Sequence, residues 1–362
     1  MNQHPPDLTP ALPGQPHCTL ISDSDSFHLS QIHTGFSLLH SAGEIRLSQE
    51  CRNQDHFDPA KPQHLRDARQ AHLLVIVNGN TKLYYDCHDS HEIDESAAAE
   101  VDCYFKRSYA KAAIPDDLRP KVFSLGFNYE IYPATCDSLE QQRLSSFPSQ
   151  LTEPDEPQFR PNVENMHAGP NMLLARRVLF MTRAWDPFDH PDRSQEKIAE
   201  RICINETRVR CIELLKREFG SRFLGGFVHT DYAMQNYSDA LLPDNEASRK
   251  DNYIRLLRQY PICVTTTGLH GSIGWKMGEY VAFSRAIISE DLNYEVPGDF
   301  KPEQNYLRFD QPDECANAAH RLLTDEALRF NMMKTNHDYY LSYLKPDAMI
   351  RRTLKIGLGR QQ

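Results

Sequence analysis

The sequence lacks any long apolar run. Its apolar stretches, such as 73–77 and 286–289, are far shorter than the ~20 residues that a transmembrane helix needs. Residues 1–16 contain five prolines and no apolar segment of the kind found in a signal peptide. We therefore expect a disordered tail at 1–16, a cytoplasmic protein without a transmembrane segment, and at most peripheral association with a membrane.

The sequence also has fewer basic residues than acidic ones. The chain has 40 Lys and Arg against 50 Asp and Glu, which gives a formal net charge of -10. Because nucleic-acid affinity comes largely from clustered Lys and Arg that neutralise phosphates, this balance argues against a nucleic-acid partner. The sequence leaves the oligomeric state open.

Paired cysteine motifs are absent as well. The nine cysteines form no CxxC pair and lie mostly in apolar stretches, as reduced core thiols do. The sequence has no HExxH motif, and His88 and His91 have no second cluster of ligands to match them. We therefore expect neither disulfides nor a metal site, and no cofactor apart from the substrate.

What the sequence does contain is an alternation of short apolar runs with stretches of helical periodicity. This pattern is typical of βα units and a parallel sheet. It predicts an α/β fold with two series of strands. The first series is expected at 18–21, 44–47, 73–77, 83–86, 103–105 and 122–125, and the second at 177–182, 222–228, 262–265 and 286–289.

Prolines and polar residues dominate from about 135 to 171, which indicates an irregular connection. The length of 362 residues is also about that of two domains. We therefore expect an N-terminal Rossmann-like domain at 17–134 and a C-terminal one at 172–344. An extension at 345–362 would complete the chain.

The segment TTTGLHGSIGWKMGEYVAFSRAIISE, residues 265–290, carries the clearest chemistry. A strand is expected to end there, a turn with Gly268 and Gly271 to follow, and a helix to begin near Ser272. Free amides at the start of a helix bind phosphate groups, and ligands of open parallel sheets lie at this edge. Lys276 would add a positive charge, and a carboxylate at Glu279 can accept the hydroxyls of a ribose.

The same residues also have a purely structural explanation, without a bound ligand. The two glycines would then only make a tight turn, Lys276 would be solvated, and Glu279 would cap the helix or pair with Lys276. The glycine spacing fits neither GxGxxG nor GxxxxGK[ST], so the segment is neither a dinucleotide fingerprint nor a P-loop.

The order of strand, glycine-containing loop, helix with an internal glutamate and short strand resembles the donor-site segment of GT-B glycosyltransferases. The resemblance covers about 177–344. The end of this segment is similar to that of the group-1 transferases. It implies two Rossmann-like domains facing across a cleft, with a nucleoside diphosphate sugar bound in the C-terminal domain.

The resemblance also implies roles for individual residues. Glu279 matches the ribose-binding glutamate, and the loop from Gly268 to Ser272, with His270 and Gly271 in it, matches the phosphate loop. Ser272 stands where the family often has a second glutamate, so retaining stereochemistry does not follow. Arg183 matches a basic residue directed at the diphosphate, and the alternative is a surface pair with Asp186 or Asp189. Together with Lys276, Arg183 would stabilise the charge of the leaving diphosphate.

The N-terminal half supplies candidates for the acceptor side. Lys106 and Arg107 follow one predicted strand and Asn128 follows the next, and the alternative is a solvated loop. An inverting transferase needs a base within hydrogen-bond reach of the acceptor hydroxyl. The candidate bases follow two strands of this half: Asp23, Asp25, His28, Asp86, His88 and Asp89.

The resemblance therefore implies a metal-independent, hexosyltransferase-like enzyme. It would move a sugar from a nucleoside diphosphate sugar to a glycan or another glycoconjugate, in bacterial polysaccharide biosynthesis. Two alternatives stay open: a non-catalytic nucleotide- or glycan-binding protein of the same fold, and a nucleotide-sugar epimerase.

Overall fold

The computed structural model describes residues 12, 14–22, 26–51, 71–135 and 159–360. The chain forms two compact units, each with its own sheet. Unit 1 comprises 1–164, 294–298 and 341–362, and unit 2 comprises 165–293 and 299–340. The prediction of an α/β fold with two sheets is confirmed.

Unit 1 is built on a sheet of six strands in the order β2-β1-β3-β4-β5-β6. The strands are β1 (His17–Ser22), β2 (Arg46–Cys51), β3 (His72–Val77), β4 (Thr81–Asp86), β5 (Cys103–Lys106) and β6 (Val122–Ser124). The helices are η1 (Phe27–Leu29), α1 (Ser30–Ser41), α3 (Glu95–Glu100), η2 (Lys111–Ala113) and α11 (Pro346–Gly359).

The prediction of a fully parallel sheet is wrong for this unit, because β3 runs antiparallel to both β1 and β4. The cause is the turn at Asn78–Gly79, where both residues have positive φ. Asparagine followed by glycine tolerates that backbone and closes a hairpin. The remaining neighbours, β1 with β2 and β4 with β5 and β6, are parallel.

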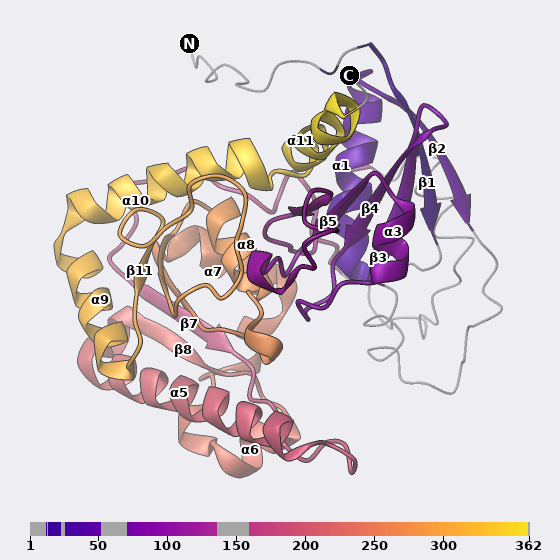
Figure 1. Ribbon diagram of the computed structural model, residues 1–362. Coiled ribbons are helices and arrows are strands. Elements are labelled where there is room, and N and C mark those ends of the chain that lie inside the picture. The colour runs from indigo at the N-terminus through magenta and orange to yellow at the C-terminus, as the bar shows by residue number, and fades with distance from the viewer. Residues whose placement is uncertain (1–11, 13, 23–25, 52–70, 136–158, 361–362) are drawn as a thin grey trace. The chain divides into compact units, whose positions relative to one another are not determined.

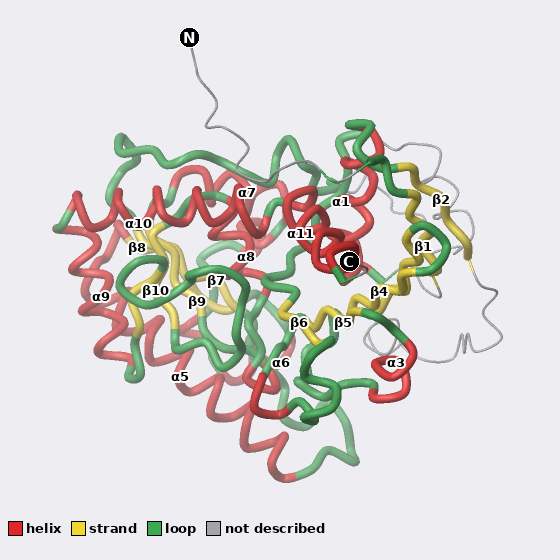
Figure 2. The backbone as a smooth tube through the Cα atoms, turned by 45° about the horizontal axis from the view of Figure 1, so that its top comes forward, coloured by secondary structure: helices red, strands yellow, loops and turns green. Residues whose placement is uncertain are grey.

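Helix α11 belongs to the core of unit 1. It lies beside α1 in both views (Figures 1 and 2), and its Ile350 and Leu354 are fully buried with Phe36 of α1. The two helices approach closely at Gly35, where a Cβ atom would clash with the carbonyl oxygen of Pro346 and the side chain of Ile350. The segment 345–362, expected to be an extension, thus supplies core residues.

Unit 2 contains a sheet of five strands, all parallel, in the order β11-β10-β9-β7-β8. They are β7 (Val178–Thr182), β8 (Phe223–Phe227), β9 (Ile262–Thr265), β10 (Ala286–Ser289) and β11 (Tyr306–Arg308). The longer helices are α5 (Gln195–Phe219), α7 (Lys250–Gln259), α8 (Trp275–Ala282), α9 (Pro312–Thr324) and α10 (Glu326–Tyr339). Shorter ones are η3 (Gly220–Arg222), α6 (Asp231–Asn236), η4 (Ser238–Ala240), η5 (Asn245–Ser248) and η6 (Leu269–Gly271). A π-helical turn at Tyr340–Leu344 follows α10, where the chain passes from unit 2 to unit 1.

The sequence pattern accounts for these elements. Alternate strand residues such as Phe180, Val264 and Ile288 are buried in one cluster with Leu215 of α5 and Leu322 of α9. Helix α5 begins after Ser194, whose hydroxyl accepts a hydrogen bond from the amide of Lys197, and ends at Gly220 with φ of 50°. Helices α5 and α9 contact each other, as Figure 1 shows.

The seven cysteines whose side chains the structure describes are free. Six of them are buried, as expected of core thiols, but Cys203 is exposed on α5. Its neighbour Ile202 is also 37% exposed, so the apolar run around them faces outward. No helix in the described ranges is long and apolar enough to cross a membrane.

Candidate functional site

The carboxyl ends of the parallel strands of unit 2 meet at one edge of the sheet. The strand order reverses between β7 and β9, because β8 lies on one side of β7 and the later strands lie on the other. Ligands of open α/β sheets bind at such a point of reversal. Arg183 follows β7 and Thr266 follows β9, so both lie at this point.

Arg208 of α5 ties the two strand ends together. Its Nε donates to the hydroxyl of Thr266 at 2.8 Å, its Nη1 to the carbonyl of Arg183 at 2.7 Å, and its Nη2 to the carbonyl of Thr267 at 3.0 Å. Burial lowers the pKa of this guanidinium to about 10, so it remains charged at neutral pH. The sheet edge therefore has a fixed, buried positive charge.

The loop between β9 and α8 is a tight, internally bonded turn. The amide of Gly268 donates to the carbonyl of Ser272 at 2.8 Å, and Gly271 has φ of 61°. A Cβ at Gly268 would lie 2.8 Å from the Ser272 hydroxyl, and one at Gly271 would lie 2.8 Å from Nδ2 of Asn293. The positive φ of Gly271 favours glycine there, whereas a side chain at Gly268 would require only that the Ser272 side chain shift.

The prediction that the helix begins at Ser272 is wrong. Helix α8 begins at Trp275 with Gly274 as its N-cap, because the carbonyl of Ser272 is already bonded to the amide of Gly268. Ser272 is buried, with 4% of its surface exposed. Lys276 consequently lies in the first turn of the helix and not one turn further along.

Several amides of the loop are already occupied. Glu290 accepts from the amide and the hydroxyl of Thr267 at 2.7 and 2.8 Å, and Glu200 of α5 accepts from the amide of His270. By contrast, the amides of Gly274 and Lys276 donate no hydrogen bond to any described residue. The start of α8 therefore has open amides, and within 268–272 the amides of Gly268, His270 and Ser272 are occupied.

Glu279 is buried and carries two contacts. Its Oε1 lies 2.8 Å from Nζ of Lys250, and its Oε2 accepts from the hydroxyl of Tyr253 at 2.8 Å. Burial alone would raise the pKa of this carboxyl, but the charges of Lys250 and Lys276 and both hydrogen bonds hold it below its usual value. Glu279 therefore remains a carboxylate.

Lys276 is half-buried, and its Nζ lies 4.4 Å from the centre of the Tyr253 ring. Burial lowers the pKa of its ammonium group, while the charge of Glu279 acts in the opposite direction. The structural alternatives for these two residues were a solvated Lys276 and a Glu279 that caps the helix or pairs with Lys276. The structure differs from both, because Glu279 pairs with Lys250 and Lys276 contacts an aromatic ring.

Arg183 is exposed at the end of β7. The alternative of a surface pair is wrong, since Asp186 accepts from the amide of Phe188 and Asp189 pairs with Arg193. Within the described ranges the guanidinium of Arg183 has no hydrogen bond or ion pair, and only its carbonyl is bonded, to Arg208.

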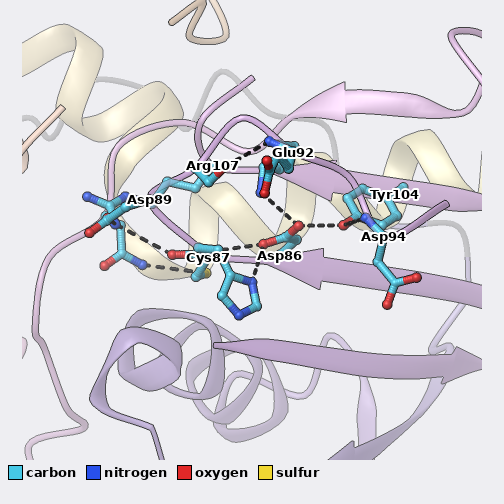
Figure 3. A network of polar contacts seen from close by, with 11 residues as sticks. Asp86, Cys87, Asp89, Glu92, Asp94, Tyr104 and Arg107 are labelled. Atoms are coloured by element: carbon cyan, nitrogen blue, oxygen red, sulfur yellow. Dashed lines mark hydrogen bonds and ion pairs between the residues drawn. The ribbon is translucent and has the colours of Figure 1, made fainter. Parts of the chain in front are cut away.

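The predicted acceptor-side residues of unit 1 belong to one polar network (Figure 3). Lys106 pairs with Asp86 at 2.8 Å, Arg107 pairs with Asp89, and the Nδ2 of Asn128 donates to the carbonyl of His28 at 2.8 Å. The alternative of a solvated loop is wrong, because the exposed fractions of Lys106, Arg107 and Asn128 are 1%, 6% and 3%.

Of the three candidate bases in the first turn, the structure describes only His28. Asp23 and Asp25 lie outside the described residues. His28 is largely buried and stacks on Phe27 with ring centres 4.5 Å apart. Burial, followed by the nearby charge of Arg107, lowers its pKa to about 4, so it is neutral at pH 7.

Sequence reasoning missed Lys250, Tyr253 and Arg208. The first two lie three residues apart on α7, a spacing that places side chains on one face of a helix. That spacing was a usable signal for the pair. Nothing in the order of residues indicated that Arg208 reaches the ends of two strands. Among the described residues no group of three His, Cys, Asp or Glu side chains is placed to hold a metal ion.

Comparison with known proteins found similar solved structures but no matching family. No protein-family model matches it, and no curated protein does. The C-terminal domain of a glycosyl transferase group 1 family protein from Francisella tularensis is 10% identical with a TM-score of 0.32, and the match covers 49% of this chain and 94% of that domain.

Two further structures contain nucleotide ligands. HepE from Anabaena with UDP and glucose is 9% identical with a TM-score of 0.43, over 94% of this chain and 98% of HepE. The pneumococcal O-GlcNAc transferase GtfA with UDP and GlcNAc is 12% identical with a TM-score of 0.38, over 77% of this chain. The match spans only 57% of GtfA.

Proposed function

We propose that this protein is a glycosyltransferase that moves a glycosyl group from a nucleoside diphosphate sugar to a hydroxyl group of a glycan or another glycoconjugate, without a metal ion. The donor would bind at the carboxyl edge of the unit 2 sheet. The observation that carries the proposal is the coincidence of three features at the reversal between β7 and β9: the open amides of α8, Lys276, and the guanidinium of Arg183, which has no partner among the described residues.

This arrangement suits a diphosphate for electrostatic reasons. The start of a helix carries a partial positive charge and free N–H donors, and both favour a phosphate oxygen. Lys276 and Arg183 add two cations, and Arg208 adds a third that is buried and fixed by three hydrogen bonds. Positive groups that are already in position stabilise the charge that develops on a leaving diphosphate.

Glu279 supports the nucleoside half of the proposal. Its carboxylate stays ionised, and Lys250 and Tyr253 fix its orientation. A charged acceptor of this kind binds vicinal hydroxyls of a ribose when they replace Nζ of Lys250, whose side chain is 25% exposed, on Oε1, while Tyr253 still holds Oε2.

A ligand screen on the full chain tests the proposal. UDP, GDP, ADP, TDP and CMP are compared for their effect on the melting temperature, because a ligand that prefers the folded state raises it. One nucleoside diphosphate is expected to give the largest increase. The corresponding sugar nucleotides are then assayed for nucleotide release, with and without EDTA, and EDTA is expected to have no effect.

Lys276→Met and its matched control Lys334→Met give the decisive comparison. Lys334 is exposed on α10, so its replacement removes the same charge away from the site. We expect about a tenfold loss of nucleotide affinity in Lys276→Met, which corresponds to about 1.4 kcal/mol, and none in the control. A wild-type protein that binds no nucleotide of the panel and releases none from its sugars refutes the proposal. Binding without release indicates a non-catalytic binding protein, and conversion of the donor sugar without any acceptor indicates an epimerase.

A further inference from the structure

Helices α7 and α8 of unit 2 contact each other through four side chains. Lys250 and Tyr253 lie three positions apart on α7, and Lys276 and Glu279 lie three positions apart on α8. Side chains at this spacing share one face of a helix. Each of the two α8 residues contacts a residue of α7, so the four groups form one cluster.

Tyr253 is the member of this cluster that contacts both residues of α8. Its hydroxyl donates to Oε2 of Glu279 at 2.8 Å, and Nζ of Lys276 lies 4.4 Å from the centre of its ring. Burial, followed by the charge of Glu279, raises the pKa of the phenol well above its ordinary value. The hydroxyl therefore keeps its proton at neutral pH and acts as the donor to the ionised carboxylate.

The two contacts of Glu279 differ in how readily they can be exchanged. The side chain of Lys250 is 25% exposed, so its ammonium group can turn to water. Tyr253 is only 5% exposed, and its hydroxyl would lose a hydrogen bond without gaining one from water. When ribose hydroxyls take the place of Lys250 on Oε1, Tyr253 is therefore the contact that continues to orient the carboxylate.

The ring of Tyr253 also restricts the ammonium group of Lys276. A cation within about 6 Å of the centre of an aromatic ring is attracted to the face of the ring, and more strongly where water is excluded. Lys276 lies in the first turn of α8, where the amides of Gly274 and Lys276 are open. Because the ring keeps the ammonium group in one place, less side-chain entropy is lost when it binds a phosphate group.

We propose that Tyr253 is a positioning residue of the donor site that acts on both halves of the nucleotide, through Glu279 on the ribose and through Lys276 on the diphosphate. This inference rests on the proposed transferase function. The hydroxyl of Tyr253 serves the first contact and the ring serves the second, so substitutions can separate them. Since the carboxylate binds vicinal hydroxyls, the hydroxyl of Tyr253 also sets how strongly the site prefers a ribonucleotide to a 2′-deoxyribonucleotide.

Two substitutions of Tyr253 test the proposal. Tyr253→Phe removes the hydroxyl and keeps the ring, and Tyr253→Leu removes both. Isothermal titration measures the affinity of the full-length variants for UDP, GDP and ADP, for the 2′-deoxy counterpart of each, and for inorganic pyrophosphate. We expect the wild type to bind the best of the three ribonucleotides about tenfold more tightly than its 2′-deoxy counterpart, because one hydrogen bond to a charged group is lost.

The variants should divide this affinity into two parts. In Tyr253→Phe the preference for the ribonucleotide should fall to about twofold or less, while the affinity for pyrophosphate stays at the wild-type value. In Tyr253→Leu the affinity for pyrophosphate should fall as well, by about threefold, because the ring no longer holds the ammonium group of Lys276. A merely structural role would instead lower the affinities for the ribonucleotide and the 2′-deoxyribonucleotide equally.

Tyr85→Phe is the matched control. Tyr85 of β4 is fully buried, and its hydroxyl lies 2.7 Å from that of Thr353 in the core of unit 1. Its replacement removes a buried, hydrogen-bonded hydroxyl that is not part of the cluster. We expect a lower melting temperature with unchanged affinity for every nucleotide of the panel.

A crystal structure of the wild-type protein with its best nucleoside diphosphate tests the same contacts without any variant. We expect the hydroxyl of Tyr253 to remain on Oε2 of Glu279, and the ammonium group of Lys276 to remain within about 6 Å of the ring centre while it contacts a phosphate oxygen. A Glu279 that has left Tyr253, or a Lys276 that has left the ring, overturns the proposal.

The failure of this proposal is distinguishable from that of the transferase function. A wild-type ratio of ribonucleotide to 2′-deoxyribonucleotide affinity in Tyr253→Phe overturns the positioning role and leaves the transferase function standing. Equal loss of pyrophosphate affinity in Tyr253→Phe and Tyr253→Leu also overturns it, because the ring alone would then have no effect. A wild-type protein that neither binds a nucleoside diphosphate nor releases one from its sugars refutes the transferase function itself.

Discussion

The ammonium group of Lys250 lies 2.8 Å from the carboxylate of Glu279, although the two residues belong to α7 and α8 and are 29 positions apart. Among the described residues of unit 2, Glu279 is the one buried acidic residue, and its second oxygen is bonded to Tyr253. The pair therefore links two helices next to β9 and gives Glu279 a structural role beside the proposed ribose contact. The two roles predict different responses to mutation.

Glu279→Gln should lower the free energy of unfolding by about 2 kcal/mol, because it removes the counter-charge of Lys250 and Lys276 in a partly buried setting. Urea denaturation measures this change. Glu303→Gln is the matched control: Glu303 pairs with Arg321 on the surface, with side chains 60% and 54% exposed. Such exposed pairs contribute less than about 1 kcal/mol. Equal stability of Glu279→Gln and wild type would contradict the structural role of the carboxylate.

Stability should also depend on pH through His28. Its pKa in the folded protein is about 4, below the ordinary value of 6.5, mainly because burial disfavours the charged ring. Between pH 6.5 and 4 the unfolded chain binds a proton that the folded chain does not bind. The folded state therefore loses stability as the pH falls through this window, by up to about 3 kcal/mol. Urea unfolding across the window should show a shallower dependence for His28→Asn than for the wild type, and parallel curves would contradict the assignment.

The sequence was sufficient to predict where most strands lie. Residues 262–265 and 286–289 form β9 and β10 as expected, because buried parallel strands appear as short continuous apolar runs. The hairpin direction of β3 was not predicted, although Asn78–Gly79 carried its signal. The start of α8 was also misplaced, since the decisive bond joins Gly268 to Ser272 within the loop.

The candidate site was only partly predictable for a different reason. Residues such as Lys276 and Glu279 lie in one recognisable segment, whereas Arg208 and Lys250 reach it from separate helices. A buried ion pair such as Asp86 with Lys106 depends on strand pairing, which spacing along the chain does not reveal. Side-chain partners across elements therefore needed the structure.

Gly35→Ala should destabilise unit 1. The added Cβ would clash with the carbonyl oxygen of Pro346 and the side chain of Ile350, so α11 would have to move away from α1. Overpacking of this kind costs about 1–3 kcal/mol. Gly359→Ala is the matched control, because it lies in α11 with open space around its Cβ position. Thermal unfolding should show a lower melting temperature for Gly35→Ala alone, and equal losses in both variants would contradict the close approach.

Arg208 gives the sharpest test of the proposed donor site. Arg208→Met keeps much of the side-chain volume but removes the hydrogen bonds to Thr266, Thr267 and the carbonyl of Arg183. Leaving these buried acceptors unpaired should cost about 2–4 kcal/mol of unfolding free energy. If the guanidinium also supplies charge to a diphosphate, the nucleotide affinity of Arg208→Met should fall by about tenfold or more. Arg208→Lys should restore part of the affinity but little of the stability, because an ammonium group cannot reach both strand ends. Isothermal titration with the best nucleoside diphosphate and urea unfolding separate the two effects. A variant with lowered stability and wild-type affinity would limit Arg208 to holding β7 and β9 together.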